Sequence, residues 1–424
     1  MARPTSRSDT VIERYFQAYG HAPVLVVLKD RHWEAKRDEP AGMDCFLDKL
    51  PEAAGPAAAA PSGPAARDGR GRQPREPAPR PVYFPGLGIE WGYVDPAGYR
   101  ALAKHDGVED VYDAATVTLP HPVQVSRPLE AADVAADAAL PHLRLINVEP
   151  LWKKNLTGEG VAVGHLDTGV DGQHPAFDGR IADFVEVAFD GSLKEPAAEP
   201  HDSGKHGTHT AATICGGTVG GVQLGVAPKA RLYSAVVIEG GNTLLRVLSG
   251  MQWMLQKGVK VINLSLGVPG YTPFFEAVMR RLRADGVLVV CAIGNEGPHT
   301  CRSPGNYEQV VSVGAAADAK RVAAFSGSIT FRDYVRPFAP DVLAPGEGIV
   351  SALAGGGLVR MDGTSMATAL VTGLAALLKQ ADRDASPQRI EGAMKLSCQR
   401  LDGEAIWRQG FGLIDGERAY QAMQ

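Results

Sequence analysis

The run Gly363-Thr364-Ser365-Met366-Ala367, with the small and apolar stretch after it from Thr368 to Leu378, constrains this chain more than any other feature. The stretch predicts a buried helix that begins beside Ser365. Free backbone N–H groups and the positive end of a helix dipole favour negative charge at such a place. A serine hydroxyl is a poor nucleophile until a base takes its proton. The run therefore predicts nucleophilic catalysis, provided that the chain supplies a base and a carboxylate to orient it.

Both partners occur upstream of the serine. His206 lies in the run DSGKHGTH (202–209), and Asp167 follows an apolar strand at 160–166. Ligands of open α/β sheets gather at the carboxyl ends of strands, so Asp167 is well placed to orient a histidine. The order along the chain is Asp, His, Ser, which is one of the known orders for a triad of this kind.

Four motifs in this order resemble those of the subtilisin family: LDTGVDGQHP (166–175), HGTHTA (206–211), AIGNEG (292–297) and GTSMAT (363–368). The resemblance implies a serine endopeptidase that hydrolyses peptide bonds through an acyl-enzyme. Ser365 would be the nucleophile, His206 the base and Asp167 the orienting carboxylate. Asn295 would donate to the oxyanion, as the subtilisin asparagine does.

The resemblance also implies how a peptide or protein substrate is held, as a strand added to a sheet edge. Two runs would form the walls of the specificity pocket, namely Ser265, Leu266 and Gly267, and Ala292, Ile293 and Gly294. We expect a pocket with these walls to take a medium or large apolar side chain. Glu296, near its rim, would tolerate a basic one.

Residues 141–424 alternate between apolar strands and amphipathic helices, which predicts an α/β fold. A parallel sheet with helices on both faces, in three layers, is also what the resemblance implies. Five buried strands are expected at 160–166, 230–238, 260–266, 287–293 and 310–315, with helices at 242–256, 274–283 and 387–395.

Residues 1–118 differ from the rest of the chain. Strands are expected at 22–28, 87–94 and 107–112, with a helix at 97–104, and an Ala/Pro/Gly-rich insertion at 51–81 is predicted to be disordered. This pattern resembles the small α+β, ferredoxin-like propeptide of subtilases, which would act as an intramolecular inhibitor in a zymogen. An unrelated accessory domain is the alternative. Residues 119–140 are predicted to be a linker, and a maturation cut is expected between about Ala115 and Ala139.

Composition excludes several classes of function. The net charge is −5 and basic residues do not cluster, so we expect no nucleic-acid partner. No apolar run approaches the ~18 residues of a spanning helix, and no secretory signal is seen, so we expect no membrane partner and a cytoplasmic protein. Secretion by a non-standard route stays open. The five cysteines form no CxxC pair and are interpreted as reduced thiols, although Cys291 and Cys301 could pair in an oxidising space.

No cofactor is expected. His209 is interpreted as a packing residue rather than half of a metal site, because the glutamate of an HExxH motif is missing. The calcium site that the resemblance to the subtilisin family implies is expected to be weak or absent, since Ala176 and Val219 stand where relatives place oxygen ligands. Within the nucleophile helix, Ala369 to Gly373 departs from the family's Pro-His-Val-Ala-Gly, which we expect to alter packing.

Two other functions stay open at this stage. The first is a dedicated intracellular processing peptidase that trims one peptide precursor, consistent with the absence of a secretory signal. The second is a pseudoprotease that serves as a binding module, suggested by the altered nucleophile helix.

Overall fold

A computed structural model describes residues 7–36, 43, 45–47, 81–113, 118, 122–129, 134, 140–194, 196–238, 242–332 and 337–424. The chain folds into two compact units. The N-terminal unit comprises residues 1–116, 187–193 and 239–253, and the C-terminal unit comprises residues 117–186, 194–238 and 254–424. The predicted disordered insertion at 51–81 lies, except for Pro81, outside the described residues.

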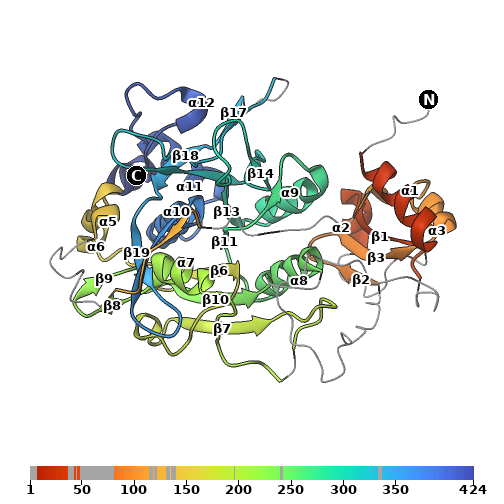
Figure 1. Cartoon of the computed structure of the whole chain (residues 1–424), viewed down its shortest axis with the longest axis horizontal. Coiled ribbons are helices and arrows are strands. Elements are labelled where there is room, and N and C mark those ends of the chain that lie inside the picture. Colours follow the sequence, from red (N-terminus) through yellow and green to blue (C-terminus); the bar gives the residue numbers. More distant parts are fainter. Residues whose placement is uncertain are drawn as a thin grey trace. The chain divides into compact units, whose positions relative to one another are not determined.

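The C-terminal unit is built on a seven-stranded sheet (Figure 1). All neighbouring strands are parallel, which confirms the predicted α/β fold. In spatial order the strands are β18 (Val342–Pro345), β15 (Val311–Ala316), β13 (Leu288–Ala292), β11 (Val261–Leu264), β6 (Ala162–Asp167), β10 (Arg231–Val236) and β7 (Ile181–Glu186). The five central strands are those that the apolar runs predict.

Helix α10 (Thr364–Ala381) is the packing centre of this unit. It contacts β11, β13, β15 and β18, and Figure 1 shows it on the side of β13 opposite α9 (Glu276–Ala284). All its residues from Thr364 to Leu378 are buried. They include the run from Ala369 to Gly373, whose sequence departs from the family pattern. Small side chains let a helix approach a sheet closely, and burial of its apolar surface stabilises the layer. The altered run therefore keeps the helix regular.

The remaining helices and short strands surround this core. The helices are α5 (Pro141–Leu145), α6 (Glu149–Lys153), α7 (His206–Cys215), α11 (Pro387–Ser397), α12 (Ile406–Gln409), α13 (Gly416–Met423), η1 (Pro175–Phe177) and η2 (Pro273–Phe275). Helix α8 (Thr243–Gln256) belongs to the N-terminal unit up to Trp253 and to the C-terminal unit from Met254. The short antiparallel pairs are β8 (Thr218–Val219) with β9 (Val222–Gln223), β12 (Val268–Pro269) with β14 (Arg302–Ser303), and β16 (Ile329–Thr330) with β17 (Phe338–Ala339).

Part of the interval predicted as a linker is a strand. Strand β5 (Gln124–Val125) extends the antiparallel pair of β19 (Ile349–Ala352) and β20 (Leu358–Asp362) to three strands. Leu129 exchanges two backbone hydrogen bonds with Leu358 and is 7% exposed within the main core. The segment 122–129 is thus packed against the C-terminal unit as part of its structure.

The N-terminal unit contains a four-stranded antiparallel sheet in the order β2-β3-β1-β4. Its elements are α1 (Arg7–Tyr19), β1 (Ala22–Leu28), α2 (Asp30–Lys36), β2 (Val82–Phe84), β3 (Ile89–Val94), α3 (Pro96–Leu102) and β4 (Val108–Asp113). From β1 onward the element order is βαββαβ, the ferredoxin-like order that the resemblance implies for this part of the chain. Elements α1, α2 and β2 were not predicted, and Ile12 of α1 is fully buried in the core of the unit.

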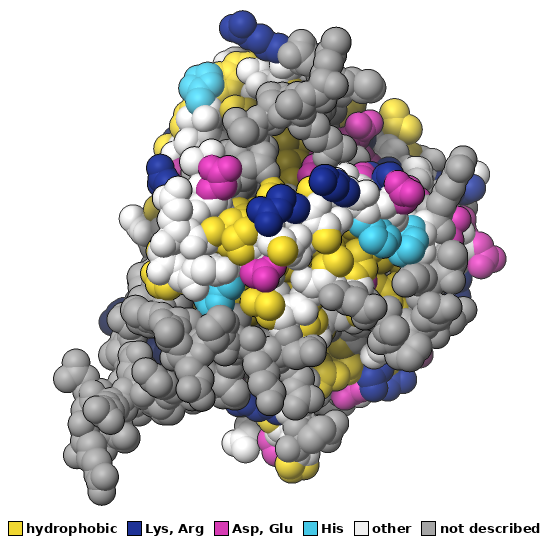
Figure 2. Space-filling view, turned by 90° about the vertical axis from the view of Figure 1, so that its right-hand side faces the viewer, with side chains coloured by type: hydrophobic (Ala, Val, Ile, Leu, Met, Phe, Trp, Pro, Cys, Tyr) yellow, Lys and Arg dark blue, Asp and Glu magenta, His cyan; other side chains and the backbone are white. Residues whose placement is uncertain are grey.

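The surface gives no sign of one dominant charge on the face that Figure 2 shows, where basic and acidic side chains of described residues are interspersed. In the part of the chain that the structure describes, no helix is both long and apolar enough to cross a membrane.

Candidate active site

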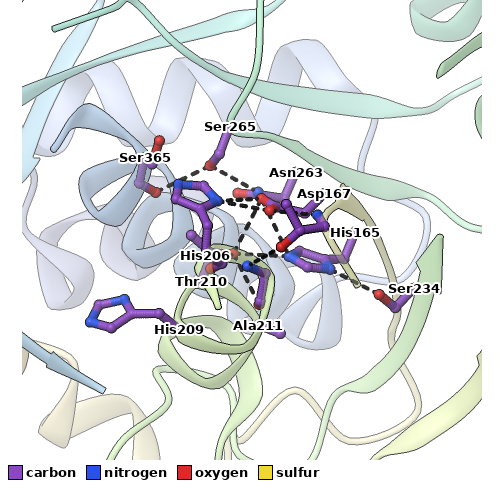
Figure 3. Close-up of polar contacts among 12 residues, drawn as sticks. His165, Asp167, His206, His209, Thr210, Ala211, Ser234, Asn263, Ser265 and Ser365 are labelled. Atoms are coloured by element: carbon purple, nitrogen blue, oxygen red, sulfur yellow. Dashed lines mark hydrogen bonds and ion pairs between the residues drawn. The ribbon is translucent and has the colours of Figure 1, made fainter. Parts of the chain in front are cut away.

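Three chain segments bring the predicted catalytic side chains to one end of the parallel sheet (Figure 3). Asp167 is the last residue of β6, His206 is the first residue of α7, and Ser365 is the second residue of α10. All three are buried, with exposed fractions of 0%, 6% and 0%. A strand end and two helix starts therefore supply the three groups, as expected for a site at the carboxyl ends of parallel strands.

Asp167 and His206 form a close, buried pair. His206 Nδ1 lies 2.8 Å from Asp167 Oδ1 and 2.9 Å from Oδ2. Because an ionised carboxylate only accepts hydrogen bonds, Nδ1 carries the proton and Nε2 of the neutral ring keeps its lone pair. Burial by itself lowers the pKa of His206, but the charge of Asp167 and the hydrogen bond to it outweigh this, and the pKa is raised above its ordinary value.

Asp202 ties the start of α7 to the end of β6. Its Oδ2 accepts from the Thr208 N–H at 2.7 Å and the Thr208 hydroxyl at 2.6 Å, and its Oδ1 accepts from the Thr168 hydroxyl at 2.7 Å and the backbone of Gly204 and Lys205. Burial raises the pKa of Asp202, but these hydrogen bonds outweigh it and the pKa is lowered. Asp202 was not predicted from the sequence, although an Asp four residues before a helical histidine is a recognisable turn and capping signal.

Ser365 is held through its backbone. Its carbonyl accepts from Ser265 Oγ at 3.2 Å, and Ser265 Oγ in turn accepts from Asn263 Nδ2 at 3.1 Å. Asn263 Oδ1 accepts from Thr372 Oγ1 at 2.9 Å. Thr372 belongs to the run of α10, from Ala369 to Gly373, that differs from the family pattern. The Ser365 hydroxyl and His206 Nε2 are both buried, and neither forms a hydrogen bond with a described residue.

Asn295 lies beside the start of α10. Its Oδ1 accepts from the Thr364 N–H at 2.9 Å and from the Thr364 hydroxyl at 2.8 Å. These bonds fix the amide, and a Cβ built at Gly363 would lie 3.3 Å from Asn295 Nδ2. The amide donor therefore faces the backbone that leads into Ser365. Glu296 Oε2 accepts from the Asn295 N–H at 3.0 Å and helps to hold this loop.

The other histidines of the motifs have structural partners. His209 Nε2 donates to the Ile349 carbonyl at 2.9 Å, and burial lowers the pKa of His209 to about 3. His165 contacts Ser234 and Thr210 through its two ring nitrogens, and His174 Nε2 donates to the Gly357 carbonyl. Only His206 among them contacts Asp167 at hydrogen-bond distance, since the nearest approach of His165 is 3.8 Å.

The two predicted substrate-binding runs are both buried. The backbone of Gly267 in the first run pairs with that of Thr118. The Thr118 N–H donates to the Gly267 carbonyl at 3.2 Å, and the Gly267 N–H donates to the Thr118 carbonyl at 2.9 Å. This is an antiparallel hydrogen-bonded pair. A Cβ at position 267 would lie 2.7 Å from the Ser303 carbonyl, so only glycine fits there. Arg302 bridges the two runs, because its N–H donates to the Ile293 carbonyl at 2.9 Å and its Nη1 to the Gly267 carbonyl at 3.0 Å.

Among the described residues, no three His, Cys, Asp or Glu side chains gather where they could hold a metal ion. Ala176 lies in the hydrophobic core, and Val219 packs against it. Neither of these positions supplies an oxygen ligand from its side chain.

Comparison with known proteins agrees with this geometry. Residues 158–413 match the Subtilase family (Peptidase_S8). The chain is 32% identical over 256 residues to the major intracellular serine protease of Bacillus subtilis, covering 58% of this chain and 77% of that protein. It is 35% identical over 269 residues to subtilisin BL of Lederbergia lenta, covering 63% of this chain and 93% of that protein.

Two solved structures are also similar. Fervidolysin from Fervidobacterium pennivorans, a keratinolytic enzyme related to subtilisin, has a TM-score of 0.68 at 24% identity, covering 95% of this chain and 61% of that chain. The prenylagaramide maturation protease PagA has a TM-score of 0.54 at 27% identity, covering 65% of this chain and 98% of that chain.

These matches place the chain in a class, the serine-type endopeptidases, whose substrates are peptides or proteins. Within that class it belongs to the subtilase family.

The hydrogen bonds of Asp202 give a test of how α7 is positioned. In Asp202→Asn the amide nitrogen cannot accept from Thr208, so the start of α7 shifts and His206 is displaced. Because small displacements of a catalytic group cost up to about 100-fold, we expect kcat/KM for a fluorogenic peptide to fall by about 10- to 100-fold.

Asp190→Asn is the matched control. Asp190 accepts from the backbone and hydroxyl of exposed Ser192 in the same way, but within a separate turn. Equal activity of the two variants would contradict a positioning role for Asp202.

Proposed function

We propose that Ser365, His206, Asp167 and Asn295 have the following roles in peptide hydrolysis. His206 Nε2 takes the hydroxyl proton of Ser365 as Oγ attacks the carbonyl carbon, and Asp167 stabilises the imidazolium that forms. Asn295 Nδ2 and the Ser365 N–H donate to the oxyanion. The imidazolium then gives its proton to the leaving amine, which breaks the C–N bond and leaves an ester on Ser365. Water, deprotonated by His206, hydrolyses that ester and restores the enzyme.

The contact between His206 and Asp167 is the observation that supports these roles most. It sets the tautomer that leaves Nε2 able to accept a proton. A pseudoprotease has no need to keep this pair or to retain a buried serine hydroxyl at a helix start, so the binding-module alternative is not favoured. The second alternative, a dedicated processing peptidase, is not favoured either, because similar proteins are described as alkaline proteases and subtilisins. PagA, in contrast, is described as a maturation protease.

Replacement of the nucleophile gives the direct test. Ser365→Ala removes the attacking oxygen, and we expect turnover to fall by ~10⁶, the value known for subtilisin itself. Labelling by a fluorophosphonate probe should be lost as well. Ser192→Ala, on an exposed turn, is the control and should keep both. Cleavage by the Ser365→Ala variant at the wild-type rate would remove the assignment.

We also propose that the N-terminal unit acts in cis as an inhibitor, with the chain after it held at the substrate-binding edge. Thr118 pairs with Gly267 as a substrate strand would, which is the addition of a strand to a sheet edge. Further along, the Val123 N–H donates at 2.8 Å to the carbonyl of Asp362, three residues before Ser365. A chain held at these two points would compete with other peptides for the same edge.

This arrangement predicts where the chain cuts itself. Because Gly267 lies in a predicted wall of the specificity pocket and Asp362 lies three residues before Ser365, we expect cleavage of a bond between Thr118 and Val123, inside the predicted interval of 115–139. N-terminal sequencing after incubation of the purified protein should find the new end in the wild type and not in Ser365→Ala. If the only N-terminus found is Met1 or Ala2, the N-terminal unit is a permanent accessory domain.

Two further properties are proposed. Activity needs no bound calcium, because Ala176 and Val219 offer no oxygen ligands from their side chains. Activity that is lost in a chelator and restored by calcium would contradict this.

The protein acts in the cytoplasm, which is supported by five free cysteines, of which Cys215, Cys291 and Cys301 are buried. Fractionation of the native host cells tests the location.

A further inference from the structure

Arg302 is a buried cation beside the substrate-binding edge. It begins β14, its exposed fraction is 8%, and it follows the Asn295 loop by seven residues. A buried charge is costly unless it is paired and hydrogen-bonded. The partners of Arg302 therefore show what its position is for.

Most of the guanidinium is used within the C-terminal unit. Its Nε lies 2.9 Å and its Nη2 2.5 Å from Glu296 Oε1, which balances the charge. Its Nη1 donates to the Gly267 carbonyl at 3.0 Å. The stem of the side chain passes close to Gly294, where a Cβ would lie 3.2 Å from Arg302 Cγ. Arg302 thus spans from one predicted pocket wall to the other, and Glu296 is already paired with it.

The same Nη1 also contacts the residue that pairs with Gly267. It lies 2.8 Å from the hydroxyl of Thr118 and 3.4 Å from the Thr118 carbonyl. Because arginine only donates hydrogen bonds, the Thr118 hydroxyl is the acceptor. A side chain without an acceptor at this place would leave a buried, charged N–H without this partner, and such a loss is more costly than the loss of a neutral hydrogen bond.

We propose that Arg302 is a specificity-determining residue. It selects peptides in which the residue paired with Gly267 carries a side-chain oxygen that can accept a hydrogen bond, as Thr, Ser, Asn and Asp do. This inference rests on the proposed function, with the chain around Thr118 occupying the place of a substrate. It replaces the expectation of a basic side chain near Glu296, since the carboxylate of Glu296 is neutralised by Arg302.

The test uses two fluorogenic peptides that copy residues 114–126 and differ only in having Thr or Val at the position of Thr118. Val matches Thr in shape and lacks the acceptor. A site built to hydrogen-bond a hydroxyl discriminates against the analogue without it. We expect wild-type kcat/KM to favour the Thr peptide by roughly 10- to 100-fold. Any competition from the protein's own segment slows both peptides equally, so their ratio is unaffected.

Arg302→Met keeps much of the stem and removes the donors, and its ratio for the two peptides should fall to about one. The matched control is Arg321→Met, because Arg321 makes a similar two-nitrogen contact with Asp318 on an exposed turn. The control should keep the wild-type ratio. Fluorophosphonate labelling of each protein reports whether Ser365 is reactive.

The possible outcomes separate the two proposals. Equal wild-type rates on the two peptides would overturn the role of Arg302, even if Arg302→Met does not fold. Equal losses on both peptides in Arg302→Met, with the wild-type ratio retained, would show that Arg302 only supports the loop. Failure of the wild type to label or cleave would instead overturn the proposed function, and with it the inference that rests on it.

Discussion

The hydrogen bond between His206 Nδ1 and the carboxylate of Asp167, at 2.8 Å in a buried setting, is the interaction on which the account of this protein depends. It decides which ring nitrogen carries the proton, and hence which one is able to act as a base. Buried carboxylates and imidazoles are costly when unpaired, so neither group is well placed without the other. The parallel sheet makes the pairing possible by ending β6 at Asp167 beside the first turn of α7.

The surrounding polar groups hold this pair by direct contacts rather than by general packing. Asp202 ties the backbone of α7 to Thr168, directly after Asp167. On the other side, Thr372, Asn263 and Ser265 link the interior of α10 to the carbonyl of Ser365. The run from Ala369 to Gly373, which departs from the family pattern, thus contributes a threonine to the support of the nucleophile. This explains how the helix tolerates the change without losing its connection to β11.

The sequence predicted what depends on local pattern, and it missed what depends on folded contacts. The five central strands were found because they are buried on both faces and so read as continuous apolar runs. The edge strand β7, with only two buried residues, was missed, as was the short edge strand β18. Elements α1, α2 and β2 of the N-terminal unit were not predicted either. The motifs placed Asp167, His206, Asn295 and Ser365. Arg302 was missed because its role lies in a partner 184 residues away, Thr118. Asp202 has local partners in Gly204, Lys205 and Thr208, but its bond to Thr168, 34 residues away, needs the folded chain.

The chain around Thr118 adds a question of control to this site, since Thr118 pairs with Gly267, the glycine that we propose a substrate would use. That question has meaning only if the pair of Asp167 and His206 is poised for proton transfer. Its most direct test is an NMR titration of His206 in the Ser365→Ala background, with and without Asp167→Asn. We predict that the pKa of His206 lies above 6.5 with Asp167 and falls below 6.5 in Asp167→Asn, because burial is then opposed mainly by the charge of Asp202, the smallest of the causes that raise this pKa. The same pKa in both proteins would contradict the account.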